Sequence, residues 1–151
     1  MSIEVYKLCE SDPLLAKSLF CWFQEDDGVE DLTAASDEYL KKLLSRDDFH
    51  TIIAINGDKI VGGLTAYELS GYKNEETEMY LFEMGVYDAF RRQGIATRLI
   101  ETLKDICRVK GIEEMFVGAW ADNVPALKLY EKTGGKGIKV VEFTYKLKEE
   151  G

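Results

Sequence analysis

The stretch MGVYDAFRRQGIATRLI, residues 84–100, joins an apolar segment to an amphipathic helical pattern. Residues 77–86, TEMYLFEMGV, predict a strand, and apolar residues recur at helical spacing from Gly94 to about Lys110. Two arginines, a glutamine and a glycine lie between the two elements. Because a helix N-terminus exposes unpaired N–H groups and a partial positive charge, this turn predicts a diphosphate site. The alternative is that the arginines are only solvated and that Gly94 only shapes the turn.

The rest of the chain alternates between strand and helix patterns. Before the opening stretch we expect strands at 3–8, 49–55 and 60–69, the last two joined by the turn NGDK, and serine-capped helices within 11–23 and 37–46. After it we expect a strand at 113–120, a helix at 124–133 and a final strand at 138–147. The order β-α-α-β-β-β-α-β-α-β predicts an α/β (α+β) fold in which a mixed, mostly antiparallel central sheet carries helices on both faces. We expect a single domain over residues 1–151.

The chain is acidic, with a formal net charge of −9 over 151 residues. Nucleic-acid-binding domains concentrate Lys and Arg, so this charge argues against a nucleic-acid partner and favours a cationic one. Neither an export signal nor a run of about 18 apolar residues is present, which predicts a cytoplasmic protein without membrane contact. Three widely spaced cysteines fit reduced thiols, and one histidine cannot build a multi-histidine site, so no metal is expected.

Five of the 28 acidic residues cluster in residues 24–35, QEDDGVEDLTAA, which contain no basic residue and which we expect to form a loop. Several carboxylates close together could attract a polycationic small molecule, because their charges act in concert. The alternative is an ordinary solvated surface. If the loop binds substrate, the candidate residues are Glu25, Asp26, Asp27, Glu30 and Asp31.

Two motifs resemble a known family. Arg91-Arg92-Gln93-Gly94-Ile95-Ala96 matches the R/Q-x-x-G-x-G/A signature of the GNAT superfamily of acetyl-CoA-dependent N-acetyltransferases. Asn123 followed by ALKLYEKTGG is similar to a second feature of that family. The resemblance implies the GNAT fold, acetyl-CoA as co-substrate and direct transfer in a ternary complex. It also implies a homodimer, with the final strand and the acidic loop as expected contact regions.

A closer resemblance lies in DEYLKKLLSRDDFHTIIAI, GGLTAYEL and EMYLFEMGVYDAFRRQGIATRLIETLK. These segments look like the type I aminoglycoside 3-N-acetyltransferases, the gentamicin and fortimicin resistance enzymes. The resemblance implies acetylation of an aminoglycoside, at its 3-amino group. Gly135 stands where many superfamily members carry an aromatic residue. The alternatives are the same chemistry on another small polyamine or peptide amine, or a non-catalytic module that only binds acetyl-CoA.

The resemblance also assigns site residues. The backbone at the end of the fourth strand would hold the pantetheine and polarise the thioester carbonyl, and Tyr130 would protonate the leaving thiolate. Asn123 would contact the cofactor as well as cap its helix; the cap alone is enough to explain it. The expected cofactor-binding set is Met84, Gly85, Val86, Arg91, Arg92, Gln93, Gly94, Ile95, Ala96, Thr97, Asn123, Ala126 and Tyr130.

Glu83 is the candidate base. It stands in the otherwise apolar segment YLFEMGV, where desolvation raises the pKa of a carboxyl group toward a value useful near neutral pH. It would deprotonate the amine directly or through water; alternatively it anchors a substrate cation or simply faces solvent. Glu78 and Tyr80 are weaker substrate-binding candidates, because strand alternation puts them opposite Glu83 unless a bulge intervenes.

Overall fold

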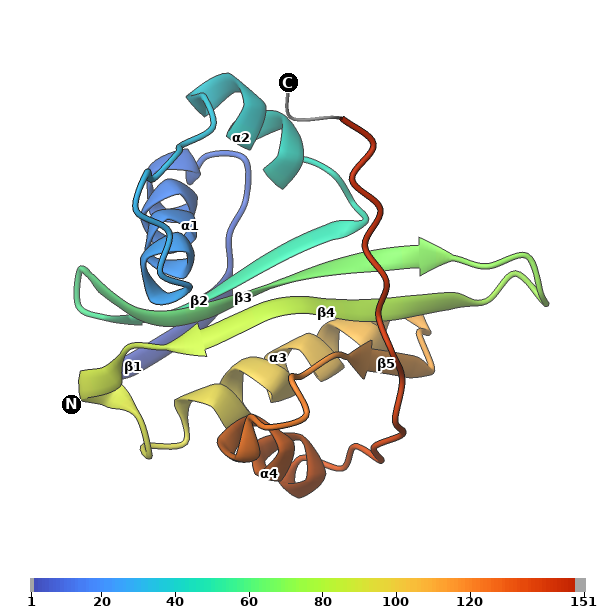
Figure 1. Ribbon diagram of the computed structural model, residues 1–151. Coiled ribbons are helices and arrows are strands. Elements are labelled where there is room, and N and C mark those ends of the chain that lie inside the picture. The colour runs from blue at the N-terminus through green and yellow to red at the C-terminus, as the bar shows by residue number, and fades with distance from the viewer. Residues whose placement is uncertain (1, 149–151) are drawn as a thin grey trace.

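A computed structural model describes residues 2–148 and contains one five-stranded sheet. The strands follow one another in chain order across the sheet, and only the last pair is parallel (Figure 1). This confirms the predicted mixed, mostly antiparallel sheet. The strands are β1 (Ile3–Lys7), β2 (Phe49–Asn56), β3 (Lys59–Ser70), β4 (Thr77–Val86) and β5 (Glu114–Val117).

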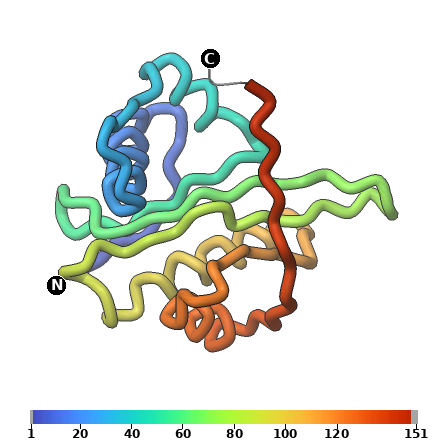
Figure 2. The backbone as a smooth tube through the Cα atoms, in the orientation of Figure 1, coloured from blue at the N-terminus to red at the C-terminus, as the bar shows by residue number. Residues whose placement is uncertain are grey.

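Helices cover both faces of the sheet, as predicted. One pair lies on one side and the other pair on the opposite side, as the ribbon and the backbone tube both show (Figures 1 and 2). Each pair closes a buried apolar cluster against the sheet. The first pair is α1 (Pro13–Asp26) and α2 (Asp37–Leu44), and the second is α3 (Ile95–Lys110) and α4 (Val124–Lys132). Among residues 2–148, no helix has the length and apolar character that crossing a membrane requires.

Local sequence signals explain several element ends. The Ser36 hydroxyl accepts a hydrogen bond from the Tyr39 amide at 3.1 Å, which is the predicted cap of α2. The hairpin between β2 and β3 differs from the expected Asn-Gly turn. Asn56 pairs with Lys59, so the two turn residues are Gly57 and Asp58. Gly57 has φ +65°, which a type II′ turn requires at its first position.

A β-bulge interrupts β4 and reverses its alternation. Thr65 of β3 pairs with Glu83, but the next residue, Ala66, pairs with Leu81, so Phe82 is an extra residue on β4. Before the bulge Leu81 is buried in the cluster under α3; beyond it Met84 packs against that cluster. Glu83 therefore faces the α1 and α2 side of the sheet, together with Tyr80.

The two parallel strands separate soon after they meet. Backbone pairing between β4 and β5 runs from Glu78 opposite Glu114 to Leu81 opposite Val117. Residues 82–86 of β4 therefore have no strand beside them on the β5 side within the described chain. This splayed half of β4 leads directly into the turn before α3 (Figure 1).

Two expectations need correction. Helix α1 continues to Asp26, so Glu25 and Asp26 lie in its last turn and not in a loop. The strand expected at 138–147 is not formed: this segment pairs with no strand in the described part of the chain, and its apolar side chains are exposed. Its alternating pattern predicts a strand. A strand also needs a neighbouring strand to accept and donate its backbone hydrogen bonds, and no strand of the described chain pairs with this segment.

Candidate active site

The turn between β4 and α3 is held by its own side chains. Arg91 donates from Nε to the carbonyl of Val86 at 3.1 Å and pairs with Asp88 at 3.0 Å. Arg92 has φ +64°, a left-handed conformation that is uncommon for a residue with a side chain. Gly94, at φ +77°, then begins α3 without a side-chain cap. The first amides of α3 are thus left without a capping side chain next to two guanidinium groups.

A pocket of about 390 Å³ lies at this turn. The turn supplies most of its wall, but the end of α4 contributes Leu129 and a third cation, Lys132. Three cations and a helix N-terminus form a suitable environment for a diphosphate. Sequence reasoning missed Leu129 and Lys132, because an ordinary amphipathic helix pattern does not show which end faces the turn. The lining is Val86, Phe90, Arg91, Arg92, Gly94, Ile95, Ala96, Thr97, Leu129 and Lys132.

The splayed half of β4 contains residues 84–86, called the ledge below, whose backbone is expected to hold the pantetheine. Gly85 also has a packing role in this strand. A β-carbon at Gly85 would lie 2.7 Å from the indole of Trp22 on α1. The absence of a side chain at Gly85 therefore lets α1 pack closely on this strand. The free edge of these residues toward β5 remains available to an extended ligand, in the manner of an added strand.

Glu83 is half-buried on the α1 and α2 face. Burial raises the pKa of its carboxyl group, and the negative charge of Asp27 raises it further. Asp27 is the C-cap of α1, so the end of that helix brings a second carboxylate into electrostatic contact with Glu83. Within residues 2–148 Glu83 forms no ion pair. A carboxyl group with these surroundings is suited to accept a proton near neutral pH.

An aromatic surface adjoins Glu83 on the same face. The ring centroids of Tyr67 and Phe82 lie 5.7 Å apart, and those of Phe82 and Tyr80 lie 5.8 Å apart. Tyr80 also stacks on Phe116 of β5 at 4.6 Å. Of these rings, sequence reasoning named only Tyr80 as a site candidate. The bulge at Phe82 places Tyr80 and Glu83 on one face of the sheet. No residue type in this part of the sequence predicts the position of that bulge.

The remaining acidic candidates are distributed unevenly. Glu30 and Asp31 are exposed in the loop after α1, which Gln24 holds by bonds to the Thr33 amide at 3.0 Å and carbonyl at 2.7 Å. Glu78 pairs with Leu69, four residues along β3 from the partner of Glu83. At a rise of about 3.3 Å per residue, Glu78 and Glu83 are roughly 13 Å apart along the sheet. The structure therefore does not bring Glu78 to the base.

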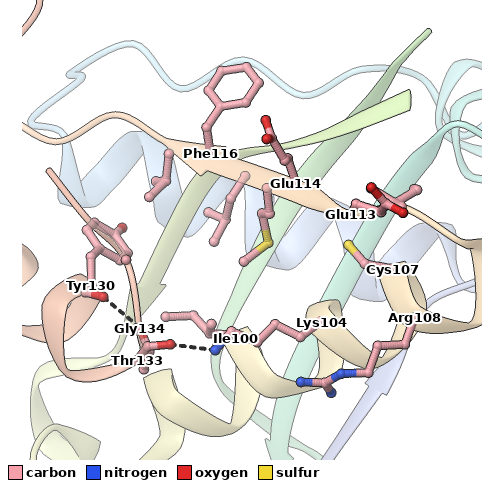
Figure 3. A pocket seen from close by; sticks show the side chains of 15 residues that line it. Ile100, Lys104, Cys107, Arg108, Glu113, Glu114, Phe116, Tyr130, Thr133 and Gly134 are labelled. Atoms are coloured by element: carbon pink, nitrogen blue, oxygen red, sulfur yellow. Dashed lines mark hydrogen bonds between the residues drawn. The ribbon is translucent and has the colours of Figure 1, made fainter. Parts of the chain in front are cut away.

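Tyr130 lies on the other side of the sheet, on α4. It lines a cavity of about 420 Å³ together with Leu81 of β4 and Val117 of β5 (Figure 3). Burial raises the pKa of its phenol, so the hydroxyl keeps its proton at neutral pH and is able to donate it. Glu83 and Tyr130 thus approach the splay between β4 and β5 from opposite faces.

The other α4 candidates lie at its first turn. The side chain of Asn123 accepts a hydrogen bond from the Ala126 amide at 3.3 Å, which is the expected cap. Neither Asn123 nor Ala126 lines the pocket at the turn before α3, and neither does Gln93. Their proposed contacts with a cofactor therefore depend on parts of a ligand that lie outside that pocket.

Comparison with known proteins agrees with this geometry. Residues 16–135 match the acetyltransferase (GNAT) family. The chain is similar to the aminoglycoside acetyltransferase meta-AAC0020 from an uncultured soil metagenomic sample, solved in complex with sisomicin, with 32% identity, a TM-score of 0.91 and 97% of each chain covered. A second aminoglycoside acetyltransferase from such a sample, HMB0005, is 33% identical over 98% of this chain and 100% of its own, with a TM-score of 0.92.

Curated relatives are matched over shorter stretches. The N-acetyltransferase YycN of Bacillus subtilis is 29% identical over 59% of this chain, and the match spans 56% of that relative's length. The N-alpha-acetyltransferase of Saccharolobus solfataricus is 31% identical over 62% of this chain and 60% of its own. The chain thus matches little more than half the length of these relatives.

Proposed function

Because the chain belongs to the acetyltransferase (GNAT) family, we propose that it transfers the acetyl group of acetyl-CoA to an amine of an aminoglycoside. The proposed site of acetylation is the 3-amino group, and both substrates are bound together when transfer occurs. The similarity to two aminoglycoside acetyltransferases over nearly the whole chain supports this substrate class.

The cofactor half of the site is the turn before α3 and the ledge on β4. Arg91, Arg92 and Lys132 surround the pocket at the uncapped start of α3, where a diphosphate would be held. From there the pantetheine would extend along the free edge of residues 84–86 toward the splay. Backbone N–H groups on this edge would polarise the thioester carbonyl.

The amine half lies on the opposite face of the sheet. Aromatic side chains form an apolar surface next to Glu83. At the acidic end of α1, the charge of Asp27 acts on the Glu83 carboxyl group. A rigid, multiply charged amino sugar needs both features: an apolar surface for its ring and carboxylates for its ammonium groups. Glu25, Asp26, Glu30 and Asp31 would add long-range attraction, which salt weakens.

Glu83 and Tyr130, on opposite faces of the sheet, carry out the two proton transfers. Acetyl-CoA supplies an activated acyl thioester. Glu83 accepts a proton from the substrate ammonium group, directly or through a water molecule, and leaves a neutral amine as the nucleophile. The neutral amine bonds to the thioester carbonyl carbon, the C–S bond breaks, and Tyr130 donates its phenolic proton to the departing sulfur. The nitrogen loses its second proton to solvent, from which the phenol of Tyr130 is reprotonated. The observation that carries the proposal is the position of Glu83 at the splayed half of β4. Burial and the charge of Asp27 both raise the pKa of its carboxyl group.

A thiol-release assay with a substrate panel tests the proposal. We expect turnover with gentamicin, sisomicin and fortimicin above that with spermidine or an unmodified peptide N-terminus, and NMR of the product should show acetylation at the 3-amino group. Acetylation at another position would overturn only the regiochemistry. Background turnover with all three antibiotics, together with consumption of a peptide amine, would overturn the aminoglycoside assignment.

A peptide N-terminus is the second candidate substrate. It is favoured by the match to an N-alpha-acetyltransferase over 62% of this chain. The charge around Glu83 distinguishes the two, because a peptide presents one ammonium group whereas an aminoglycoside presents several. Replacing Glu30 and Asp31 with the corresponding amides should therefore raise KM for an aminoglycoside and leave KM for a peptide nearly unchanged.

A further inference from the structure

The sheet face that carries Glu83 is covered only in part. Helices α1 and α2 close their buried cluster against residues of β2 and the start of β3, and no residue of β4 or β5 belongs to that cluster. On the part of this face that β4 and β5 form, Phe82 is 46% exposed and Phe116 is 43% exposed. Contiguous aromatic side chains exposed to this extent are typical of a binding surface.

Four of these side chains form a continuous apolar surface, called the aromatic floor below. Its centre is Tyr80, which stacks on Phe116 with 4.6 Å between centroids and 8° between ring planes, and on Phe82 with 5.8 Å and 14°. Tyr67 adjoins Phe82 at 5.7 Å. The spacing of Tyr80 and Phe116 is close to the distance of about 4.8 Å between neighbouring strands, so these rings stand side by side. Because each ring supports the next, the floor is rigid.

Carboxylates flank the aromatic floor at both ends. Glu83 lies at one end, and at the other Glu78 pairs directly with Glu114 across β4 and β5. Met79 is buried under α3, so its neighbour Glu78 points to the opposite face of the sheet. Figure 3 shows Glu114 and Phe116 on the side of β5 away from α3. Within residues 2–148 neither Glu78 nor Glu114 forms an ion pair, so their like charges favour a cation between them.

The charge and shape of this surface define its ligand. In the described chain, Phe143 and Tyr145 of the C-terminal residues are 76% and 84% exposed and therefore do not pack on the floor. The ligand must combine an apolar ring face with positive charges around its rim. The amino sugars of an aminoglycoside have both properties, because C–H bonds line the ring faces and ammonium groups lie at the periphery. A linear polyamine has the charges but no ring face.

We propose that the aromatic floor, with Glu78 and Glu114 at its far end, is a second subsite that binds the aminoglycoside ring farthest from the acetylated amine. This inference rests on the proposed function. Glu78 and Glu83 are roughly 13 Å apart along the sheet at a rise of about 3.3 Å per residue, which is longer than one six-membered ring. Ammonium groups bound at the two ends therefore belong to different rings. Phe116 and Glu114 thus select acceptors that carry a further ring.

Gentamicin and gentamine form a matched pair of acceptors. Gentamine retains the 3-amino group and the ring next to it but lacks the sugar at the 6-hydroxyl, which is the ring that the subsite would hold. Phe116→Ala should raise KM for gentamicin about 2- to 30-fold more than KM for gentamine, the range that one aromatic contact with a cationic ring spans. Its effect on kcat should be small, because the floor is remote from the reacting atoms. Tyr72→Ala, the loss of a fully exposed aromatic residue in the turn between β3 and β4, is the control.

The charged end has its own variant. Glu114→Gln keeps the shape of an exposed side chain, so the fold should be retained even if Phe116→Ala unfolds the protein. It should also raise KM for gentamicin more than KM for gentamine. Glu4→Gln makes the same change of charge on β1, at the other edge of the sheet, and should not distinguish the two compounds. Without acetyl-CoA, gentamicin should shift the NMR signals of the Phe116 ring more than gentamine does.

Three results would contradict the subsite. Turnover of both compounds with the same KM ratio in the unaltered protein, Phe116→Ala and Glu114→Gln would overturn it and leave acetylation of aminoglycosides in place. Nuclear Overhauser effects between the Phe116 ring and residues 138–147 that persist with gentamicin bound would show that the chain itself covers the floor. Turnover of neither compound by the unaltered protein would overturn the proposed function, and the subsite with it.

Discussion

The indole of Trp22 fills the space in which a side chain on Gly85 would lie, with 2.7 Å between an ideal β-carbon and the ring. The same indole stacks on Tyr87 at 4.2 Å. Helix α1 is thereby held against the splayed half of β4, and the acidic residues at its end are held near Glu83. One close contact thus links the two proposed half-sites.

Gly85→Ala should therefore destabilise the protein. The added methyl group cannot fit unless Trp22 moves, and overpacking of this kind costs about 1–3 kcal/mol of unfolding free energy. Urea unfolding monitored by tryptophan fluorescence measures the loss. Gly118→Ala is the matched control, because nothing lies within 4 Å of its β-carbon. Equal stability of the two variants would show that α1 does not pack on β4 in this way.

The acid limb of the rate profile should report Glu83. Burial and Asp27 raise the pKa of this carboxyl group, so kcat/KM should fall, as pH decreases, at a pH above the ordinary value of 4.5 for glutamate. Asp27→Asn removes one of the two causes and should move this limb to lower pH. Asp31→Asn, a change of equal charge in the same acidic stretch, is the control. Movement of the limb by both variants alike would indicate a general field and not the Asp27 contact.

Removal of the proposed base, Glu83, should lower the rate without loss of fold. Glu83→Gln keeps the shape of the side chain but accepts no proton, so kcat should fall by about 10²–10⁴-fold. Steady-state kinetics separate this from the alternative role. A rise in aminoglycoside KM with kcat unchanged would identify Glu83 as a substrate anchor only.

Arg92 and Tyr130, the residues proposed to hold acetyl-CoA and to protonate its sulfur, should behave differently on substitution. Arg92→Ala should raise KM for acetyl-CoA several-fold with little change in kcat, because it removes a cation from the pocket before α3. Arg98→Ala, the loss of an exposed cation of α3 outside that pocket, should change neither. Tyr130→Phe should lower kcat and leave acetyl-CoA affinity, measured by calorimetry, unchanged. A shared loss of affinity in Arg92→Ala and Tyr130→Phe would contradict these roles.

A buried histidine makes stability depend on pH. His50 is 1% exposed, bonds to Glu68 at 2.6 Å and accepts a hydrogen bond from Lys7 at 2.8 Å. Burial lowers its pKa from 6.5 although Glu68 opposes this, while Lys7 and Lys110 lower it further. The unfolded chain therefore binds a proton at a higher pH than the folded one, so stability that is fully present above pH 6.5 should be lost as the pH falls below that value toward the lower pKa of the folded state.

Urea unfolding between pH 7.5 and pH 5.5 measures the effect. His50→Asn should be less stable at the higher pH, because it weakens the bonds to Glu68 and Lys7, but its stability should change less with pH. A parallel decline in both proteins would assign the dependence to other groups.

Local patterns account for the elements that the sequence predicted well. Helical spacing after Gly94, the Ser36 and Asn123 caps and the short connection between β2 and β3 all arise within a few residues of chain, and the structure has each of them. The pocket at the start of α3 was predictable for the same reason, since the turn that forms most of it is continuous in sequence.

Features that depend on two distant parts of the chain were not predictable. Lys132 reaches the pocket only because α4 packs next to α3, and the role of Gly85 depends on a ring 63 residues earlier in the chain. The expected strand at 138–147 failed for a related reason: its own residues alternate correctly, but pairing requires an edge that the described single chain does not place beside it.

The extra residue at Phe82 determines which face of the sheet carries the Glu83 carboxylate, and with it the proposed amine site. In a regular strand Glu83 would point toward α3, into the apolar cluster behind the proposed cofactor, and the two substrates would compete for one compartment. The inserted residue instead turns that carboxylate to the α1 and α2 face of the sheet. In the proposed reaction, the molecule that delivers an acetyl group and the one that receives it would therefore bind on opposite faces of the sheet, so that neither must leave before the other arrives.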